Sequence, residues 1–340
     1  MRFIACVELA GKTLLITGIG GFIGRRTAQI AAARGMQVWG VELDAERARA
    51  VEDSIRGVRV IVGDGLDPEV AAEAVRGVDV VLHTAAIVRE GGSLAEFRRV
   101  NVEGTRVLAE AARAAGVSVF IQLSSVMVYG FRYPDRVTED GPLRGESNPY
   151  CITKIESEAA VLEHHDPGAF DVIIIRPGDV YGPGSLPWVV RPLDLMRRRM
   201  FALVDGGAGI MNHLYVDNLV DGILLAAEQP EKAGGLAFNL TDGEATTWRE
   251  YFTRLARAGG QREPFSVPGW LMKAAIYLLN FLRMLVFMKP EVLPQGVDFV
   301  RRPHAVSIER ARDVLDYEPF VDLREGIAHT RNWLARRDQK

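Results

Sequence analysis

Cysteine is scarce in this chain of 340 residues, which contains two, Cys6 and Cys151. Two isolated cysteines argue against a disulfide framework and against a thiolate metal site, so we expect no bound metal and a reducing, cytoplasmic environment. Neither sign of charge dominates, and the formal net charge of -3 gives nucleic acid no electrostatic attraction. Repeats and low-complexity blocks are also missing. With 48% apolar and 25% charged residues, the composition is that of an ordinary globular protein.

Uninterrupted hydrophobic runs of membrane-spanning length are lacking as well. The longest candidate, residues 270–288, contains Lys273, Asn280 and Arg283. Each charge inside a spanning helix costs about 2.5–3.5 kcal/mol, which disfavours a single-pass helix. The N-terminal stretch is interrupted by Glu8 and is too short and acidic for a secretory signal. Two interpretations of 270–288 stay open: peripheral membrane contact, and a core helix whose Lys273 and Arg283 extend to solvent.

Short apolar runs alternate with helical patterns through the first half of the chain, which predicts a parallel sheet with helices on both faces. One helical pattern is residues 98–116, ended by Gly116. The predicted strands are 13–17, 37–42, 58–63, 79–84, 118–125, 171–177 and, further on, 236–241.

The alternation loosens after Pro177, where the sequence becomes rich in turn residues and then mainly helical. We therefore expect an α/β fold with a doubly wound parallel sheet, Rossmann-like, formed by 11–178 plus about 212–245. A smaller, mainly helical C-terminal substrate domain should comprise about 179–211 and 246–340. Ligands should bind in the cleft between the two domains.

The stretch TGIGGFIG, residues 17–24, follows the first predicted strand and precedes a helix. In that setting Gly18 permits a tight turn, Gly21 lets the backbone approach a pyrophosphate, and Gly24 lets helix and strand pack closely. Gly20 adds only slack. The free N–H groups at the helix start then hold a phosphate, so the motif predicts a dinucleotide site.

Glu42 stands at the end of the second predicted strand. A carboxylate there accepts hydrogen bonds from the ribose hydroxyls of NAD and repels the 2'-phosphate of NADP. NAD is therefore the favoured cofactor. The alternative is that Glu42 is a surface residue and that Arg25 or Arg26 binds the 2'-phosphate. Asp64, after the third strand, is placed to accept from the adenine amino group or to shape a turn.

Tyr150 and Lys154 lie four residues apart at the start of a predicted helix, so their side chains share one face. An adjacent ammonium favours the phenolate and would bring the phenol into range for proton transfer. Ser124 and Ser125 end a predicted strand at the ligand-binding edge of the sheet. We expect one of the two serines to face the cleft.

Taken together, the motifs resemble those of the extended short-chain dehydrogenases/reductases, the NAD-dependent epimerase/dehydratase superfamily. The resemblance covers nearly the whole chain and rests on TGIGGFIG, GD at 63–64, HTAA at 83–86, Asn101, LSSVMVYG, YCITK, RPGDVYGPG and YVDN at 215–218. It implies that Ser125, Tyr150 and Lys154 catalyse hydride transfer between a nicotinamide and a secondary alcohol or ketone, with Lys154 also holding the nicotinamide ribose. HTAA departs from the usual Asn-containing version, so His83 is expected to be a structural residue at a strand end.

The resemblance also implies a wider cofactor site along the sheet edge, with Pro177 and Val180 beside the nicotinamide and Ala85 approaching from the fourth strand. The full expected set is Gly18, Gly20, Gly21, Phe22, Ile23, Gly24, Glu42, Asp64, Gly65, Leu66, Thr84, Ala85, Ala86, Asn101, Tyr150, Lys154, Pro177 and Val180.

For the substrate, the chain is similar to the 3β-hydroxysteroid and sterol dehydrogenase branch, which includes 4-carboxysterol 3-dehydrogenases. Sugar-nucleotide members carry an arginine before the V-x-D element, where this chain has Met211, Asn212 and His213. A methionine suits an apolar ligand, so Ser125, Met127, Met211 and His213 are the expected substrate contacts. Arg191 and Arg197 to Arg199 keep a nucleotide-sugar epimerase or dehydratase as an alternative.

A third interpretation is a cofactor-binding regulator of the same fold that no longer catalyses. The intact Ser125, Tyr150 and Lys154 argue against it. Relatives similar to this chain often dimerise through a four-helix contact, so a homodimer is compatible with the sequence, although no residue stripe indicates it.

Overall fold

The computed structural model describes residues 8–89, 91–146, 148–285 and 294–337. Its largest element is a seven-stranded sheet in the order β11-β6-β5-β4-β1-β2-β3, in which every neighbouring pair is parallel. The strands are β1 (Thr13–Thr17), β2 (Gln37–Glu42), β3 (Arg59–Val62), β4 (Val80–His83), β5 (Val119–Leu123), β6 (Asp171–Pro177) and β11 (Ala237–Leu240). All seven apolar runs predicted as strands form this sheet, which confirms the expected fold class.

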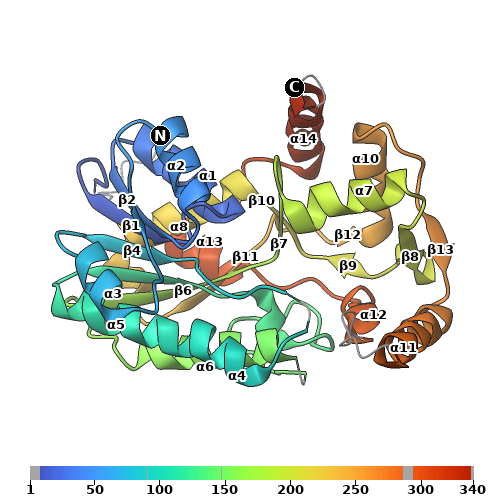
Figure 1. Ribbon diagram of the computed structural model, residues 1–340, viewed down its shortest axis with the longest axis horizontal. Helices are drawn as coiled ribbons and strands as arrows, with labels where there is room; N and C mark the ends of the chain where they lie inside the picture. The colour runs from blue at the N-terminus through green and yellow to red at the C-terminus, as the bar shows by residue number, and fades with distance from the viewer. Residues whose placement is uncertain (1–7, 90, 147, 286–293, 338–340) are drawn as a thin grey trace.

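Helices cover both faces of the sheet (Figure 1). One face carries α1 (Phe22–Ala33), α2 (Ala45–Ser54) and α8 (Val216–Glu228); the other carries α3 (Pro68–Ala74), α5 (Gly104–Ala114) and α6 (Pro149–Leu162). Alternation along β1 explains the two layers: Leu14 and Ile16 point into the first core and Leu15 into the second. The order of strands reverses between β1 and β4, which is where ligands bind in open α/β sheets.

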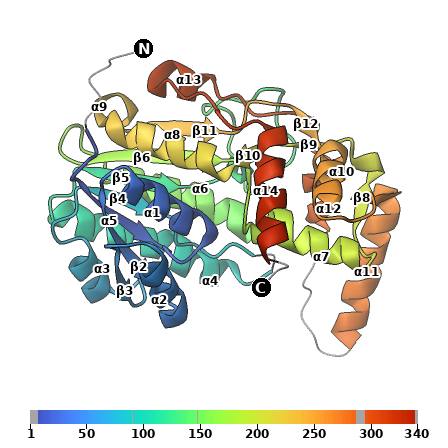
Figure 2. The same ribbon diagram turned by 90° about the horizontal axis from the view of Figure 1, so that it is seen from above.

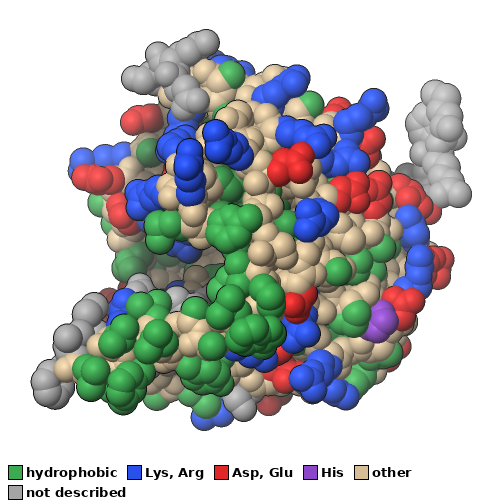
Figure 3. Space-filling model, turned by 90° about the vertical axis from the view of Figure 1, so that its right-hand side faces the viewer, with side chains coloured by type: hydrophobic (Ala, Val, Ile, Leu, Met, Phe, Trp, Pro, Cys, Tyr) green, Lys and Arg blue, Asp and Glu red, His purple; other side chains and the backbone are tan. Residues whose placement is uncertain are grey.

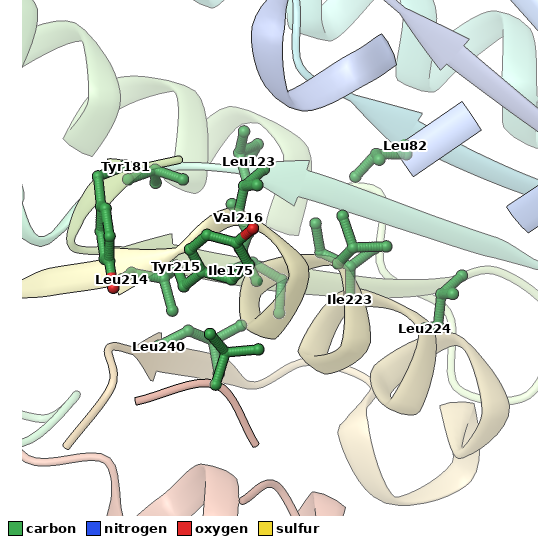
Figure 4. Packing of buried hydrophobic residues seen from close by; sticks show 14 of the residues in the cluster. Leu82, Leu123, Ile175, Tyr181, Leu214, Tyr215, Val216, Ile223, Leu224 and Leu240 are labelled. Atoms are coloured by element: carbon green, nitrogen blue, oxygen red, sulfur yellow. The ribbon is translucent and has the colours of Figure 1, made fainter. Parts of the chain in front are cut away.

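The first core packs the sheet against α8. In Figure 4, Leu82, Leu123 and Ile175 from three neighbouring strands lie over the α8 side chains Ile223 and Leu224. All of these side chains are buried. Packing of this kind fixes the carboxyl ends of β4, β5 and β6, from which the candidate site is built.

The predicted helix over 98–116 is interrupted. The structure has α4 (Leu94–Arg98), one π-helical turn at Arg99–Glu103, and then α5. The buried Asn101 in the π-turn directs its side chain out of the helix, and a Cβ on Gly104 would come within 2.2 Å of Leu66 Cδ2. The wider turn therefore accommodates two tertiary contacts that the helical periodicity did not reveal.

The remaining elements lie mostly beside the large sheet, at the right of Figure 1. Three two-stranded pairings occur that the sequence did not predict, β10 with β7, β12 with β9 and β13 with β8; strands of two or three residues are too short to show a period. The bounds are β7 (Asp179–Tyr181), α7 (Arg191–Arg197), β8 (Ala202–Val204), β9 (Ile210–Met211), β10 (His213–Tyr215), α9 (Pro230–Ala233), β12 (Thr246–Thr247), α10 (Trp248–Ala258), β13 (Phe265–Val267), α11 (Gly269–Leu285), α12 (Gln295–Phe299), α13 (Glu309–Leu315) and α14 (Leu323–Arg337), with short turns of helix at Val126–Tyr129, Leu186–Val190 and Asp205–Gly207. The division into two domains at the predicted boundaries stays a prediction.

Helix α11 covers the described part of the apolar segment 270–288 and is not a core helix. Gly269 is its one buried residue, whereas most of its large apolar side chains are exposed. The core interpretation of this segment is therefore wrong for residues 270–285. Within the described residues, no helix combines the length and the apolar character that a membrane crossing requires.

Candidate active site

The glycine-rich turn between β1 and α1 forms a cradle without side chains. Gly18 has a φ of +65°, and a Cβ there would lie 3.3 Å from Thr84 Oγ1 and from the Ala85 backbone. A Cβ on Gly24 would lie 2.5 Å from the Gly18 carbonyl oxygen. Gly21 is the N-cap of α1 and provides no side-chain cap, so the first N–H groups of α1 are left for an anion. The cradle fits a pyrophosphate, with Phe22 and Ile23 in the first turn of the helix.

Glu42 connects this cradle to β2. Its carboxylate is buried and accepts from Gly20 N at 2.9 Å and from Asp44 N at 3.2 Å. A Cβ on Gly20 would lie 2.7 Å from Glu42 Oε2. The interpretation of Gly20 as mere slack is therefore wrong, because the absence of a side chain there lets the carboxylate reach the loop.

The two arginines proposed for a 2'-phosphate are engaged elsewhere. Arg26 makes a bidentate ion pair with Asp217 at 2.6 and 2.7 Å, and Arg25 donates to Ser54 Oγ at 3.0 Å. Arg26 is thus committed to Asp217 and Arg25 lies against Ser54, whereas the buried Glu42 carboxylate lies at the phosphate cradle, which favours NAD over NADP.

The loops after β3 and β4 complete the expected cofactor edge. Asp64 is exposed and closes a turn by accepting from Leu66 N at 3.0 Å, with Gly65 between them. Thr84 Oγ1 donates to the Thr17 carbonyl at 2.7 Å, and Ala85 N donates to Thr17 Oγ1 at 3.2 Å. These bonds hold 84–86 against the end of β1, beside the glycine cradle.

His83 and Asn101 are buried connectors. The ring nitrogens of His83 lie 2.7 Å from Thr17 Oγ1 and 3.1 Å from Thr105 Oγ1, and burial lowers its pKa to about 3, so it is neutral. This agrees with the expected structural histidine. Asn101 accepts from Ile87 N at 2.7 Å and donates to Thr153 Oγ1 at 3.2 Å. It thereby ties the loop after β4 to the helix that carries Lys154.

Ser125 and Tyr150 meet at the carboxyl edge of the sheet. Ser125 follows β5 and is the N-cap of the turn Val126–Tyr129, with its Oγ accepting from Met127 N at 3.2 Å. Asn148 caps α6 and accepts from Tyr150 N at 2.9 Å, which fixes the start of the helix. The Ser125 side chain lies beside the Tyr150 phenol and favours its ionised form. Burial nevertheless raises the Tyr150 pKa to about 12, with Ser125 opposing the rise.

Lys154 lies one helical turn beyond Tyr150 and is buried. Its Nζ donates to the Leu123 carbonyl at 2.7 Å and lies 5.9 Å from the centre of the Tyr150 ring. Burial lowers the Lys154 pKa to about 8, against a stabilising field from Glu158. The expected lowering of the Tyr150 pKa by this ammonium is not seen, because the ammonium is bonded to the end of β5 and desolvation dominates at the phenol.

A buried ion pair beneath Lys154 was not predicted from the sequence. Glu158 on α6 pairs with Arg176 on β6 through Nε–Oε1 at 3.0 Å and Nη2–Oε2 at 2.6 Å. Ser124 Oγ donates to the same carboxylate. Of the two serines, Ser125 therefore lies beside the tyrosine, and Ser124 is bonded to Glu158. An acid four residues after Lys154 and an arginine before Pro177 were visible in the sequence, but nothing there joined them.

The order of these groups along the sheet edge decides the family. From β2 to β6 the edge presents Glu42, the glycine cradle, Ala85, Ser125 with Tyr150 and Lys154, and Pro177. The model of the NAD dependent epimerase/dehydratase family matches residues 14–241. The chain belongs to this family. It is an NAD-dependent enzyme of the extended short-chain dehydrogenase/reductase type, and its cofactor is NAD.

Relatives cover almost the whole chain. The chain is 31% identical to a 4-hydroxy-2-methyl-3-oxo-4-farnesyl-3,4-dihydroquinoline-1-oxide ketoreductase of Stigmatella aurantiaca, over 92% of this chain and 93% of that protein. It is 29% identical to the decarboxylating sterol-4-alpha-carboxylate 3-dehydrogenase of Mus musculus, over 94% and 90%. An epimerase structure from Methanothermobacter thermautotrophicus superimposes with a TM-score of 0.79 at 23% identity, covering 97% of this chain and 94% of that one.

Two of the expected substrate contacts are buried in this family member. Met211 is fully buried in the core, and His213 is 1% exposed. The ring nitrogens of His213 lie 2.8 Å from Asp242 Oδ2 and 2.8 Å from Thr246 Oγ1. The expectation that Met211 and His213 contact the substrate stays a prediction. Met127 is partly exposed beside Ser125 and stays a prediction.

The end of β6 is held against β10. Pro177 and Val180 are buried on either side of Gly178, where a Cβ would lie 2.0 Å from the Asn212 carbonyl oxygen. Only glycine permits this approach, so the RPGDV segment is fixed next to the catalytic edge. The roles of Pro177 and Val180 beside the nicotinamide stay predictions.

A cluster of aromatic and apolar side chains lies in the part of the fold made by α7, β8, α10 and α12. Phe131, which closely follows Ser125 in sequence, packs edge-on against Phe299, and Phe299 stacks on Trp188. A cavity of about 300 Å³ adjoins these rings. Its lining includes Trp188, Phe201, Leu203, Val204, Trp248 and Phe252.

Arg302 is another buried residue that the sequence did not predict to be functional. It is fully buried, its Nη2 donates to Asp179 Oδ2 at 2.8 Å, and its guanidinium lies 4.0 Å from the centre of the Phe299 ring. Its Nε and Nη1 have no hydrogen-bond partner among the described residues. Both nitrogens are closed to solvent, so their N–H groups are unsatisfied inside the core, beside the Trp248 and Phe299 rings.

Proposed function

We propose that this enzyme transfers a hydride between C4 of the nicotinamide and the carbon of a secondary alcohol or ketone in a hydrophobic substrate. The observation that carries the proposal is the placement of Ser125 beside the Tyr150 phenol, one helical turn from Lys154 and along the sheet edge from the glycine cradle. Bound NAD supplies the hydride acceptor, and NADH the donor.

The three side chains divide the work on the substrate oxygen. In reduction, hydride adds to the carbonyl carbon and Tyr150 gives its proton to the oxygen; in oxidation, Tyr150 takes the hydroxyl proton as hydride leaves. With its pKa raised to about 12, the phenol carries that proton at neutral pH. Ser125 orients the oxygen. Lys154, with a pKa of about 8, is mostly charged at pH 7 and supports the proton transfer electrostatically.

The proposed substrate class is a 3-hydroxysteroid or sterol, a 4-carboxysterol included. The apolar cavity and the aromatic side chains that connect it to Phe131 support a hydrophobic substrate. The names of two relatives point the same way, one to a sterol carboxylate and one to a farnesylated ring ketone.

A nucleotide-sugar epimerase or dehydratase is the second candidate, and the match to the epimerase/dehydratase family model is the observation that favours it. The two unsatisfied donors of Arg302 are closed to solvent and do not distinguish a phosphate from the carboxylate of a 4-carboxysterol. Arg197, in contrast, pairs with Asp194 at 3.1 Å on the surface. The apolar cavity favours the sterol class.

The experiment that tests the function is a turnover assay with NAD and NADH on a panel of 3-hydroxysteroids, 3-ketosteroids, alkyl ketones and UDP-sugars. Tyr150→Phe should lower turnover by roughly 100-fold or more, since general acid–base catalysis contributes that much, while NADH affinity stays unchanged. Ser125→Ala should lower kcat more than its neighbour Ser124→Ala, whose hydroxyl contacts Glu158. Retained turnover in Tyr150→Phe would refute the mechanism. Tight NADH binding with no turnover on any compound would favour a regulator, and turnover of UDP-sugars alone would favour the second candidate.

A further inference from the structure

The polarity of α11 is inverted relative to that of an ordinary surface helix. Its half-buried positions lie on one face, toward the body of the protein: Met272, Lys273, Ile276, Asn280 and Arg283. This face contains both charged residues of the helix, and Lys273 donates to both carboxylate oxygens of Asp298 at 2.8 and 2.9 Å. The side chains that α11 presents to the outside are thus the apolar ones.

The outward face is built from large side chains. Trp270 is 72% exposed, Tyr277 62%, Leu278 59% and Phe281 52%. The other large exposed side chains of α11 are Leu271, Leu279, Leu282, Met284 and Leu285. Figure 3 shows hydrophobic side chains gathered along a ridge at the edge of this side of the molecule, and Figure 2 shows α11 at the rim, far from the seven-stranded sheet. A contiguous apolar surface of this size marks an interaction site.

The shape of this surface identifies its partner. At 100° per residue, the exposed positions of α11 span an arc of about 220°. A protein with a flat surface covers one side of such a ridge. For a helix of 17 residues, about 25 Å long and about 10 Å wide, one side offers roughly 400 Å², half of the ~800 Å² per partner that a stable protein dimer buries. Lipid acyl chains, in contrast, surround a ridge on every exposed side.

The chemistry of the helix agrees with a lipid partner. α11 contains no Asp or Glu, so acidic headgroups meet no like charge on the helix. Trp270 and Tyr277 belong to the residue types enriched at the interface of a bilayer, where their rings are buried and their polar atoms hydrated. Lys273 lies on the half-buried face of α11, toward the protein, where it forms an ion pair with Asp298.

We propose that α11 docks the enzyme on a lipid bilayer, lying along the interface with the Trp270–Phe281–Leu285 side in the acyl region and the Lys273 face toward the protein. The apolar cavity adjoins the first residue of α11. Val204, which lines the cavity, lies 3.3 Å from the position that a Cβ on Gly269 would occupy. Docking therefore brings the cavity next to the bilayer. The proposal depends on the helix alone and holds whichever substrate the enzyme takes.

Flotation of the full-length protein with phosphatidylcholine vesicles, with and without a minority of phosphatidylserine, tests it. The wild type should float with both kinds of vesicle, because apolar burial drives binding. Leu278→Glu together with Phe281→Glu should lower the partition coefficient roughly 100-fold, since charges are costly in the acyl region. The matched control is Phe320→Glu, which charges an equally exposed apolar residue (61%) outside α11 and should float like the wild type.

Two further measurements make the result decisive. Both variants change exposed side chains, so their circular dichroism and unfolding midpoints should equal those of the wild type. Quenching of Trp270 fluorescence by brominated lipid, lost in Trp270→Phe, should report insertion of that ring. Wild-type protein that stays with the soluble fraction, flotation that the α11 variants leave unchanged, or a dimer in lipid-free buffer that these variants dissociate would each overturn the proposal.

Discussion

The ion pair between Arg176 and Glu158 gives the sharpest quantitative prediction. Arg176 donates four hydrogen bonds: two to Glu158, one to Tyr129 Oη at 2.8 Å and one to the Glu139 carbonyl at 2.9 Å. Arg176→Met removes all four and leaves the Glu158 carboxylate buried without its cation. Breaking a buried pair on one side costs about 3–5 kcal/mol, so the folding equilibrium constant should fall roughly a thousand-fold.

A double variant separates the charge from the packing. Arg176→Met with Glu158→Leu removes the buried carboxylate as well, and the remaining loss is that of partners for Ser124 and the Glu139 carbonyl, at about 1 kcal/mol each. Tyr129 Oη keeps its bond to Asn239 at 2.7 Å. The double variant should therefore be more stable than Arg176→Met alone, although it carries one more substitution.

Urea unfolding of the wild type, Arg176→Met, Glu158→Leu and the double variant measures these differences. The control is Arg98→Met, which breaks an exposed ion pair with Glu156; Glu156 lies on α6, as Glu158 does. This variant should barely change the unfolding midpoint. If Arg176→Met were as stable as Arg98→Met, or if the double variant lost the sum of the two single losses, the inference that a buried, uncompensated charge dominates would be refuted.

Three further outcomes are expected. Between pH 8 and pH 10.5 the unfolded chain holds more protons at Lys154 than the folded one, so the stability of the wild type should rise relative to Lys154→Met by about 1.4 kcal/mol per pH unit; a flat difference in unfolding midpoints would contradict the lowered pKa. Gly24→Ala should weaken NADH binding measured by fluorescence titration, whereas Gly296→Ala, with open space at its Cβ, should not. Glu42→Ser should narrow the preference for NAD over NADP in kcat/KM, and an unchanged ratio would remove Glu42 from ribose recognition.

The sequence predicted the sheet well because each of its strands is an apolar run bounded by turn residues. Glu42, Ser125 and Tyr150 could be placed at one edge for the same reason, since strand ends and helix starts define that edge. A local sequence pattern does not predict hydrogen bonds between segments that are far apart in the chain. Gly20 looked like slack because the carboxylate that needs its space is 22 residues away.

The burial and surroundings of individual side chains were the other properties that the sequence did not predict. The burial of His213 could not be predicted, because nothing nearby in the sequence indicates Asp242 and Thr246 as its partners. The segment 270–288 looked ambiguous because its composition suits a core and an interface equally, and only the direction of Lys273 toward Asp298 distinguishes them. The pKa of Tyr150 depended on where the Lys154 ammonium finds its acceptor, which the spacing of four residues does not reveal.

The position of β11 in the sheet has a consequence for biosynthesis. This strand pairs with β6 yet comes some sixty residues later in the chain, after α7 and α8. While the ribosome is still translating the intervening stretch, the outer edge of β6 presents unpaired N–H and C=O groups to the cell. The sheet is completed only when residues 237–240 emerge, so a nascent chain paused before that point would be prone to strand-mediated association.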